Sequence, residues 1–241
     1  METLDVVKAV AEPIGSAGGA FYFHPDTLAR GKEIGLDGFR LYMLGRAGVL
    51  GDVPARVVES AFGYFNRPLV EKIYESARER VPPPEAASVY LECCANLGRK
   101  RLADIDGLDA YCAAAEKIVA AARPAALPLF AGISNAPLPD DVPGRAMQLT
   151  AVLRELRGSV HLVAIAAVDL DNAVAHAIRR PDDVASFGYE DPPEVTEVDR
   201  GKLAEADELT NRLLVAYYSG LDEAEGQALV DGATAINQAL S

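Results

Sequence analysis

The stretch LRELRGSVHLVAIAA, residues Leu153–Ala167, places two arginines, a glutamate and a histidine directly before a highly apolar run. This run does not alternate between polar and apolar residues, so it favours a buried helix over a half-exposed strand. Glycine has a low helix propensity, and we therefore expect one helix to end at Gly158 and another to begin with Ser159 as its N-cap. His161 would then lie in a first helical turn, where the helix dipole disfavours a protonated imidazole. The sequence predicts a neutral His161.

The composition is that of a globular chain. Its 241 residues are 50% hydrophobic, which is enough to bury a substantial core. Its apolar runs are shorter than the roughly 18 residues that a membrane-spanning helix needs. The N-terminal METLDVVKAVAEP carries two acids before its first lysine, unlike the basic start of a signal peptide. We expect a soluble, cytoplasmic protein that does not enter a membrane, with Cys93, Cys94 and Cys112 in the reduced state.

The pattern along the chain predicts an all-α fold. Apolar residues recur at spacings of three and four, as on one face of a helix. Residues 24–35 begin with His-Pro-Asp and end in glycine, which is typical of a capped helix. Further helices are predicted within residues 37–48, 52–65, 67–81, 82–100 and 104–123.

A proline-rich segment divides the chain nearly in half. Residues 124–143 lack helical periodicity, and we predict that they connect a helical repeat in residues 1–123 to another in residues 144–241. The second half repeats the order of glycine breaks, apolar stripes and a Pro-Pro-Glu helix start found in the first. We therefore predict two similar helical halves. Identities between the halves are few, so chance similarity between alanine-rich helices is the alternative.

The net charge of −13 is unevenly distributed. Residues 1–124 hold 15 basic and 17 acidic residues, whereas residues 125–241 hold 8 and 19. Within residues 182–231 there are 14 acids but only three basic side chains, Arg200, Lys202 and Arg212. Such a surface repels a phosphate backbone, so we expect no binding to nucleic acid.

Arg154 and Arg157 form the centre of the candidate site. They are three residues apart and share a helix face, whereas Glu155 is expected to point elsewhere and to leave the arginine donors for an anion. Arg46 lies in the apolar sequence YMLGRAGVL, where burial would require a partner such as Glu59, Asp26 or a bound carboxylate. These arginines and His161 would frame a small anionic ligand between the halves. The alternative is an interhelix ion-pair hub with a purely structural role.

Three groups of residues identify a family resemblance. They follow a Glu-Pro…Tyr-Phe-x-Pro-acid pattern, a Gly-Phe…Tyr…Gly-Arg-Ala…Leu-Gly pattern and a Leu-Arg-Glu-x-Arg-Gly-x-x-His pattern. The matching residues are Glu12, Pro13, Tyr22, Phe23, Pro25 and Asp26; Gly38, Phe39, Tyr42, Gly45, Arg46, Ala47, Leu50 and Gly51; and Leu153, Arg154, Glu155, Arg157, Gly158 and His161. Over residues 11–178 the sequence resembles an uncharacterised bacterial family of actinobacterial type that is helix-turn-helix-like. The resemblance implies a helix-turn-helix or winged-helix-like scaffold.

Tyr22 and His24 complete the set of candidate ligand-binding residues. Both lie in FYFHPD, where a histidine before Pro-Asp serves either as a helix cap or as a base. His176, in an alanine-rich helix, is expected at the surface. The three histidines are far apart and the cysteines lack Cys-x-x-Cys spacing, so we predict no metal site and no cofactor.

Three functions remain open. The first is a non-enzymatic small-molecule-binding or regulatory protein on a helix-turn-helix-like scaffold that has lost DNA binding. The second is an enzyme that acts on an anionic small molecule at the Arg/His site. The third is a DNA-binding transcriptional regulator, for which the predicted helix DVPARVVESAFGYF offers one arginine and two acids. We also consider a homodimer.

Overall fold

The computed structural model describes residues 1–241 and contains helices but no strand, as predicted. The helices of the first half are α1 (Thr3–Ala9), α2 (Ala11–Ala17), α3 (Pro25–Glu33), α4 (Gly38–Ala47), η1 (Gly48–Leu50), α5 (Ala55–Phe62), α6 (Arg67–Arg78), α7 (Pro83–Arg101) and α8 (Leu108–Ala121). Those that follow are α9 (Pro128–Ser134), α10 (Val142–Ala167), α11 (Asn172–Arg179), η2 (Pro181–Phe187), α12 (Glu197–Tyr218) and α13 (Glu223–Leu240).

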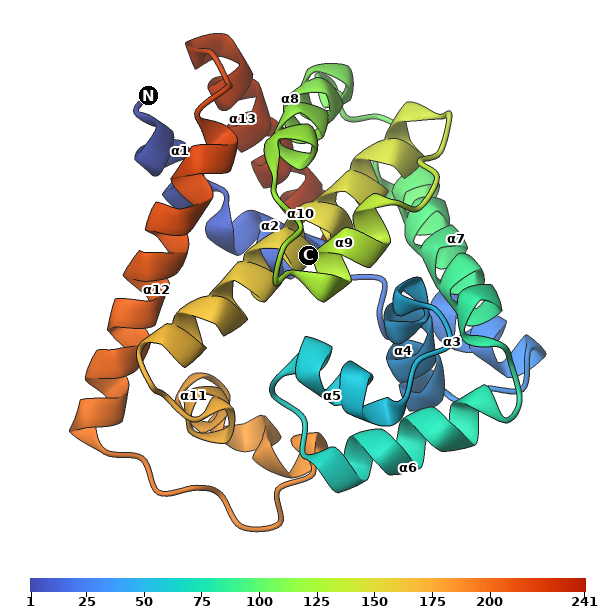
Figure 1. Cartoon of the computed structure of the whole chain (residues 1–241). Coiled ribbons are helices and arrows are strands. Elements are labelled where there is room, and N and C mark those ends of the chain that lie inside the picture. Colours follow the sequence, from blue (N-terminus) through green and yellow to red (C-terminus); the bar gives the residue numbers. More distant parts are fainter.

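Helix α10 runs through the middle of the molecule. It packs against α2, α7, α8, α9 and α12, and Figure 1 shows it between α12 on one side and α7 on the other. Its residues between Gly144 and Leu156 are nearly all buried, because neighbouring helices surround it on several sides. Helices that are covered all round are expected to be apolar all round. This position accounts for the buried stretch between Gly144 and Leu156, whereas the apolar run after His161 is buried only at Ala164 and Ile165.

The expected helix break at Gly158 is wrong. Helix α10 continues through Gly158 for 26 residues, so His161 lies in the helix interior and Ser159 is not an N-cap. The N-cap is Asp141, which accepts a hydrogen bond from the Gly144 amide at 2.9 Å. A glycine inside a helix costs about 1 kcal/mol relative to alanine. Burial of the helix on both sides of Gly158 outweighs that local preference.

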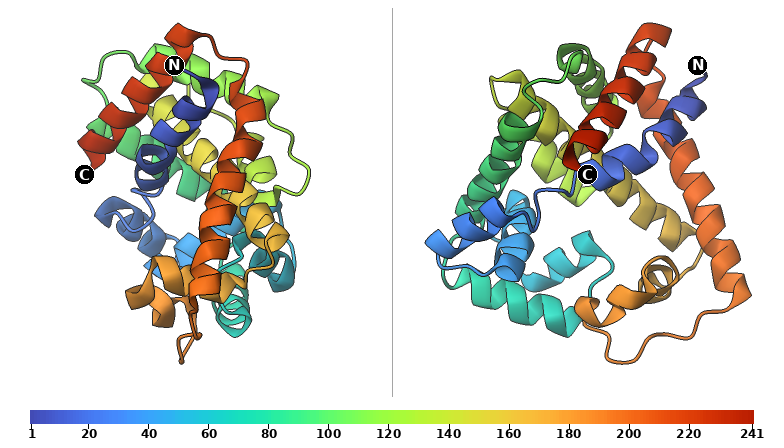
Figure 2. Two further views of the ribbon diagram at one scale, coloured as in Figure 1. Left: turned by 90° about the vertical axis from the view of Figure 1, so that its left-hand side faces the viewer. Right: turned by 180° about the vertical axis from the view of Figure 1, so that it is seen from behind.

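The two ends of the chain meet on one side of the bundle. Helix α1 packs against α12 and α13, and α2 packs against α13, as both views in Figure 2 show. The main core is a single cluster of buried side chains that extends from Val6 to Ile236. A smaller cluster around Ile165 and Leu203 lies between α10, α11 and α12. The amino-terminal helices therefore depend on the carboxy-terminal ones for burial.

The proline-rich connector is more ordered than expected. Residues 128–134 form α9, which packs against α10, α5 and η1. The predicted repeat pairs the segment that forms α4 with the segment that begins α10. These two helices differ in length, because α4 has 10 residues and α10 has 26. The duplication and the division at residues 124–143 stay predictions.

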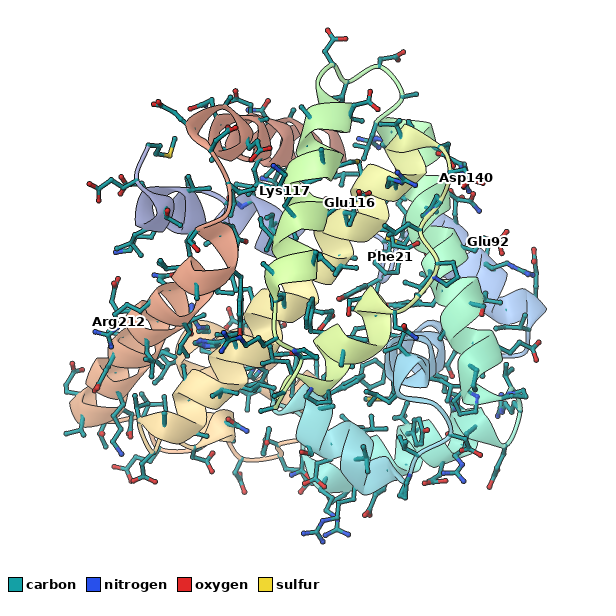
Figure 3. All side chains as sticks on the ribbon, turned by 45° about the horizontal axis from the view of Figure 1, so that its top comes forward. Phe21, Glu92, Glu116, Lys117, Asp140 and Arg212 are labelled. Atoms are coloured by element: carbon teal, nitrogen blue, oxygen red, sulfur yellow. The ribbon has the colours of Figure 1, made fainter.

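None of the helices by itself combines the length and the apolar character that spanning a bilayer requires; α10 and α11 together have both, but the chain bends by 118° between them. Figure 3 shows charged side chains such as Glu92, Asp140 and Arg212 at the periphery of the molecule, whereas Phe21 lies between the helices. Phe21 is 1% exposed. The polar groups described next are therefore exceptions inside an apolar interior.

Candidate functional site

Glu155 is a buried carboxylate at the centre of the fold. Its side chain is 5% exposed and lies on α10, facing Arg46 of α4. Nε of Arg46 donates to Oε1 at 2.8 Å and Nη2 donates to Oε2 at 2.8 Å, which is a two-pronged ion pair. The guanidinium also lies 4.4 Å above the ring of Phe62. Arg46 is therefore paired with Glu155, and not with Glu59 or Asp26 as expected.

Tyr22 and Arg154 complete the environment of this carboxylate. The hydroxyl of Tyr22 donates to Oε1 of Glu155 at 3.0 Å and accepts from Nη1 of Arg154 at 2.7 Å. Arg154 also donates to Oε1 of Glu155 at 3.3 Å and to the carbonyl of Gly15 at 3.2 Å. We call Tyr22, Arg46, Arg154 and Glu155 the Glu155 hub. The expectation that Glu155 points away from the arginines is wrong.

The electrostatics of the hub favour its charged state. Burial raises the pKa of Glu155, but the charge and hydrogen bonds of Arg46, together with Arg154 and Tyr22, outweigh burial and lower it to about 2. Burial acts to lower the pKa of Arg46, and the Glu155 carboxylate raises it well above its usual value. Burial raises the pKa of the Tyr22 hydroxyl, which therefore stays protonated as a donor. The carboxylate already accepts four hydrogen bonds from three side chains of the protein.

A close helix crossing places Arg154 against Tyr22. A Cβ on Gly18, the C-cap of α2, would lie 2.8 Å from Cβ of Arg154 and 2.9 Å from the carbonyl of Thr150. Only glycine permits this approach of α2 to α10. The segment after α2 then carries Tyr22 over the guanidinium of Arg154, whose Cζ lies 4.9 Å from the ring centre.

Arg157 and His161 belong to a second polar cluster, on the α12 side of α10. Nη2 of Arg157 donates to Oδ1 of Asn211 at 2.9 Å, and no carboxylate lies within 4.0 Å of this guanidinium. Nδ1 of His161 lies 3.0 Å from Oγ1 of Thr210, which itself donates to the Ala206 carbonyl at 2.7 Å. Because that hydroxyl hydrogen is used, Nδ1 is the protonated nitrogen and Nε2 carries the lone pair.

Two buried nitrogens of this second cluster have no hydrogen-bond partner in the protein. They are Nη1 of Arg157, a donor, and Nε2 of His161, an acceptor. Burial, followed by the charge of Arg179, lowers the pKa of His161 to about 4. The imidazole is therefore neutral at pH 7, as predicted, but burial and a neighbouring cation are the cause and not a helix N-terminus. We call Arg157, His161, Thr210 and Asn211 the Arg157 cluster.

The remaining histidines have other surroundings. His24 caps α3 by accepting a hydrogen bond from the Asp26 amide at 3.3 Å, so it lies apart from both polar clusters. His176 was expected at the surface but is 5% exposed, because its ring packs 3.8 Å from the ring of Phe187. The six predicted residues thus divide into three places: Tyr22, Arg46 and Arg154 in the hub, Arg157 and His161 in the second cluster, and His24 at α3.

Several site residues were missed by sequence reasoning. Glu155 was seen but misplaced, while Thr210 and Asn211 were not considered. A signal for Glu155 does exist: Val152, Glu155, Leu156 and Ser159 follow helical spacing and are all buried. That spacing is apparent only when the helix is taken as continuous through Gly158.

Helices α5 and α6 have the connection of a helix-turn-helix. Four residues, Gly63–Asn66, join them, and Gly63 has a φ of 77°, which favours glycine. Helix α4 packs against α6 as the third helix of the unit. The model of a family described as "Helix-turn-helix family" matches residues 7–190.

The chain belongs to this helix-turn-helix family. Its scaffold is therefore of a regulatory or DNA-binding type. No curated protein and no solved structure matches the helix-turn-helix chain. The polar clusters lie outside α5 and α6, because Glu155 and Arg157 are on α10 and Asn211 is on α12.

Proposed function

We propose that this protein is a non-enzymatic regulator in which the helix-turn-helix unit serves as a packing scaffold and no longer reads DNA. The carrying observation is that the amino-terminal end of α6, the second helix of the unit, is covered by the last residue of η2. The Asn66 amide donates to the Phe187 carbonyl at 2.8 Å, and the rings of Phe65 and Phe187 stack at 4.1 Å. Recognition helices contact bases with this end, so the covered end cannot enter a groove.

The charges of α6 support the same proposal. Arg67 pairs with Glu71 at 2.8 Å, and Arg78 pairs with Glu75 at 3.3 Å and with Asp52 at 3.6 Å. Arginines that bind DNA must release their partners to contact phosphates. Both arginines of α6 thus already pair with carboxylates of the same chain, which leaves the exposed Lys72 as its one basic side chain without such a partner.

We expect no retardation of duplex DNA at about 10 µM protein and about 150 mM salt, where basic non-specific binders still form complexes. An electrophoretic mobility shift with random and genomic fragments measures this, with a basic helix-turn-helix protein as the positive control. Retardation that is lost on Arg67→Ala would show that α6 does reach DNA, and it would overturn the proposal.

For the regulatory ligand we propose a small anion at the Arg157 cluster. The Arg157 guanidinium is partly buried and has no carboxylate within 4.0 Å, so Asp207 offsets its charge only from a longer distance and a bound anion would compensate it further. The two unpartnered nitrogens are a donor and an acceptor, so they suit an anionic group that also carries a hydroxyl, such as a hydroxycarboxylate or a monohydrogen phosphate. The Glu155 hub is less suited to this role or to catalysis, because its groups already bond one another.

An anion that binds should raise the melting temperature of the wild type. At ten times its Kd the stabilisation is about 1.4 kcal/mol, or a shift of about 3–6 °C for a chain of this size. A thermal-shift screen of phosphate, lactate and sulfate at constant ionic strength measures it, with Arg157→Gln as the test variant. Arg212→Gln, which changes an exposed arginine of α12, is the matched control.

The proposal requires the shift to persist in Arg212→Gln and to disappear in Arg157→Gln. If Arg157→Gln is less stable than the wild type while no anion shifts either protein, the cluster is a structural contact and the ligand proposal fails.

A further inference from the structure

A small internal cavity adjoins the Glu155 hub. Its volume is about 20 Å³, and it lies where α4, α7, α9 and α10 meet. One side is polar and is formed by Tyr22, Arg46, Tyr90 and Glu155; the other side is apolar and is formed by Phe21, Val49, Leu91, Leu129 and Ile133. These polar side chains thus gather at one end, but the surface that the cavity exposes is almost wholly apolar.

Tyr90 provides the one unused polar group at that end. Its side chain is buried, at 2% exposure, and its hydroxyl has no hydrogen-bond partner in the protein. Arg46 and Glu155 line the same cavity but neutralise each other. A buried hydroxyl without a partner is unfavourable by about 1–3 kcal/mol. An unpartnered hydroxyl thus lies beside the cavity but is covered from it in this structure, and the two charged residues that line the cavity are paired with each other.

A larger cleft lies directly outside this cavity. It has a volume of about 470 Å³ and runs between α7 and α9, with residues 135–139 along one edge. Val49 and Leu91 line both spaces and are each partly exposed, so they separate the cleft from the inner cavity. Clefts of this size hold small organic molecules. Glu92 and Arg99 at its rim carry opposite charges.

Helix α9 covers the inner cavity like a lid. Leu129 and Ile133 face the inner space and Gly132 faces the cleft, so one seven-residue helix borders both. Two residues before this helix, Ala126 has a φ of 63°, in the left-handed region that a residue with a Cβ rarely adopts. Backbone strain of this kind clusters at ligand clamps and switch segments. Ala126 is thus a strained backbone position directly before α9.

We propose that the inner cavity and the cleft together form a binding site for a neutral amphipathic molecule, with α9 as its lid. The polar group of the ligand bonds the Tyr90 hydroxyl, and its apolar body passes between Val49 and Leu91 into the cleft. The balanced Arg46–Glu155 pair and the apolar walls select an uncharged ligand. This site is separate from the anion site proposed at Arg157, and the two proposals stand or fall independently.

The fluorescent probe N-phenyl-1-naphthylamine tests the proposal, because it is neutral, has one N–H group and brightens in apolar surroundings. We expect a saturable rise in fluorescence with one site on the wild type. Tyr90→Phe should weaken binding about five-fold, the loss of one neutral hydrogen bond. Ser88→Trp, which places a large ring in the cleft from an exposed position on α7, should abolish binding.

The matched control is Glu85→Trp, an equally exposed position on α7 that does not line the cleft. It should bind the probe as the wild type does. Circular dichroism checks that each variant is folded. An absence of saturable binding to the wild type, or undiminished binding by folded Ser88→Trp, overturns the proposal. Undiminished binding by Tyr90→Phe overturns the assigned polar contact and with it the orientation of the ligand.

Discussion

Replacing Glu155 by glutamine should lower the free energy of unfolding by about 3–5 kcal/mol, the range for removing one partner of a buried ion pair. The change leaves Arg46 and Arg154 next to each other with no carboxylate between them, and both are largely covered by other side chains. Glutamine has nearly the same shape, so the loss reports charge and not volume. Urea unfolding followed by circular dichroism measures it.

Two variants make the test specific. Arg46→Met should be less damaging than Glu155→Gln, because Glu155 keeps a partner in Arg154 and the hub, which holds two arginines and one carboxylate in the wild type, becomes neutral. Glu205→Gln, on the exposed side of α12, should change stability by no more than about 0.5 kcal/mol. A larger loss for Arg46→Met than for Glu155→Gln would contradict the view that the carboxylate balances both arginines.

The lowered pKa of Glu155 predicts that the stability of the protein decreases at acidic pH. The pKa of Glu155 is lowered from 4.5 to about 2 in the folded protein. Its contribution to stability is therefore complete above about pH 4.5 and is lost as the pH falls toward 2. The difference in stability between the wild type and Glu155→Gln should shrink across that interval, and urea unfolding at a series of pH values measures it.

Gly48→Ala should lower the free energy of unfolding by about 3 kcal/mol, at the upper end of the range for overpacking. A Cβ at this position would lie 1.9 Å from the backbone carbonyl oxygen of Pro83, at the start of α7. No rotamer change relieves a clash with backbone, so η1 and α7 must move apart. Thermal and urea unfolding measure the loss.

Gly158→Ala is the matched control for this substitution. Nothing lies within 4 Å of a Cβ at Gly158, which is inside α10. Alanine should therefore raise stability by about 0.5–1 kcal/mol through its higher helix propensity. A loss of stability in Gly158→Ala would contradict the continuous helix through this residue.

The sequence by itself determined the helical class and those helices whose ends are marked by local chemistry. Residues 24–35 predicted α3, and the structure confirms His24 as its N-cap and Gly35, at a φ of 80°, after its end. Such signals act within one turn of the chain, through capping hydrogen bonds and backbone preference, and therefore can be read without knowledge of the fold. The neutral state of His161 was also predicted, although for a different reason.

Only the tertiary structure decided which charged and polar groups meet. Glu155 bonds Arg46, 109 residues away in the sequence, and Tyr22, 133 residues away. Covering the end of α6 likewise needs Phe187, which lies far along the chain. Ion-pair partners depend on which helices pack together, so no local sequence pattern specifies these partners. Burial then strengthens each electrostatic contact, because the protein interior has a lower dielectric constant than water. Gly158 is a second example: its low helix propensity predicted the end of a helix, but the burial of α10 on either side of this residue keeps the helix continuous.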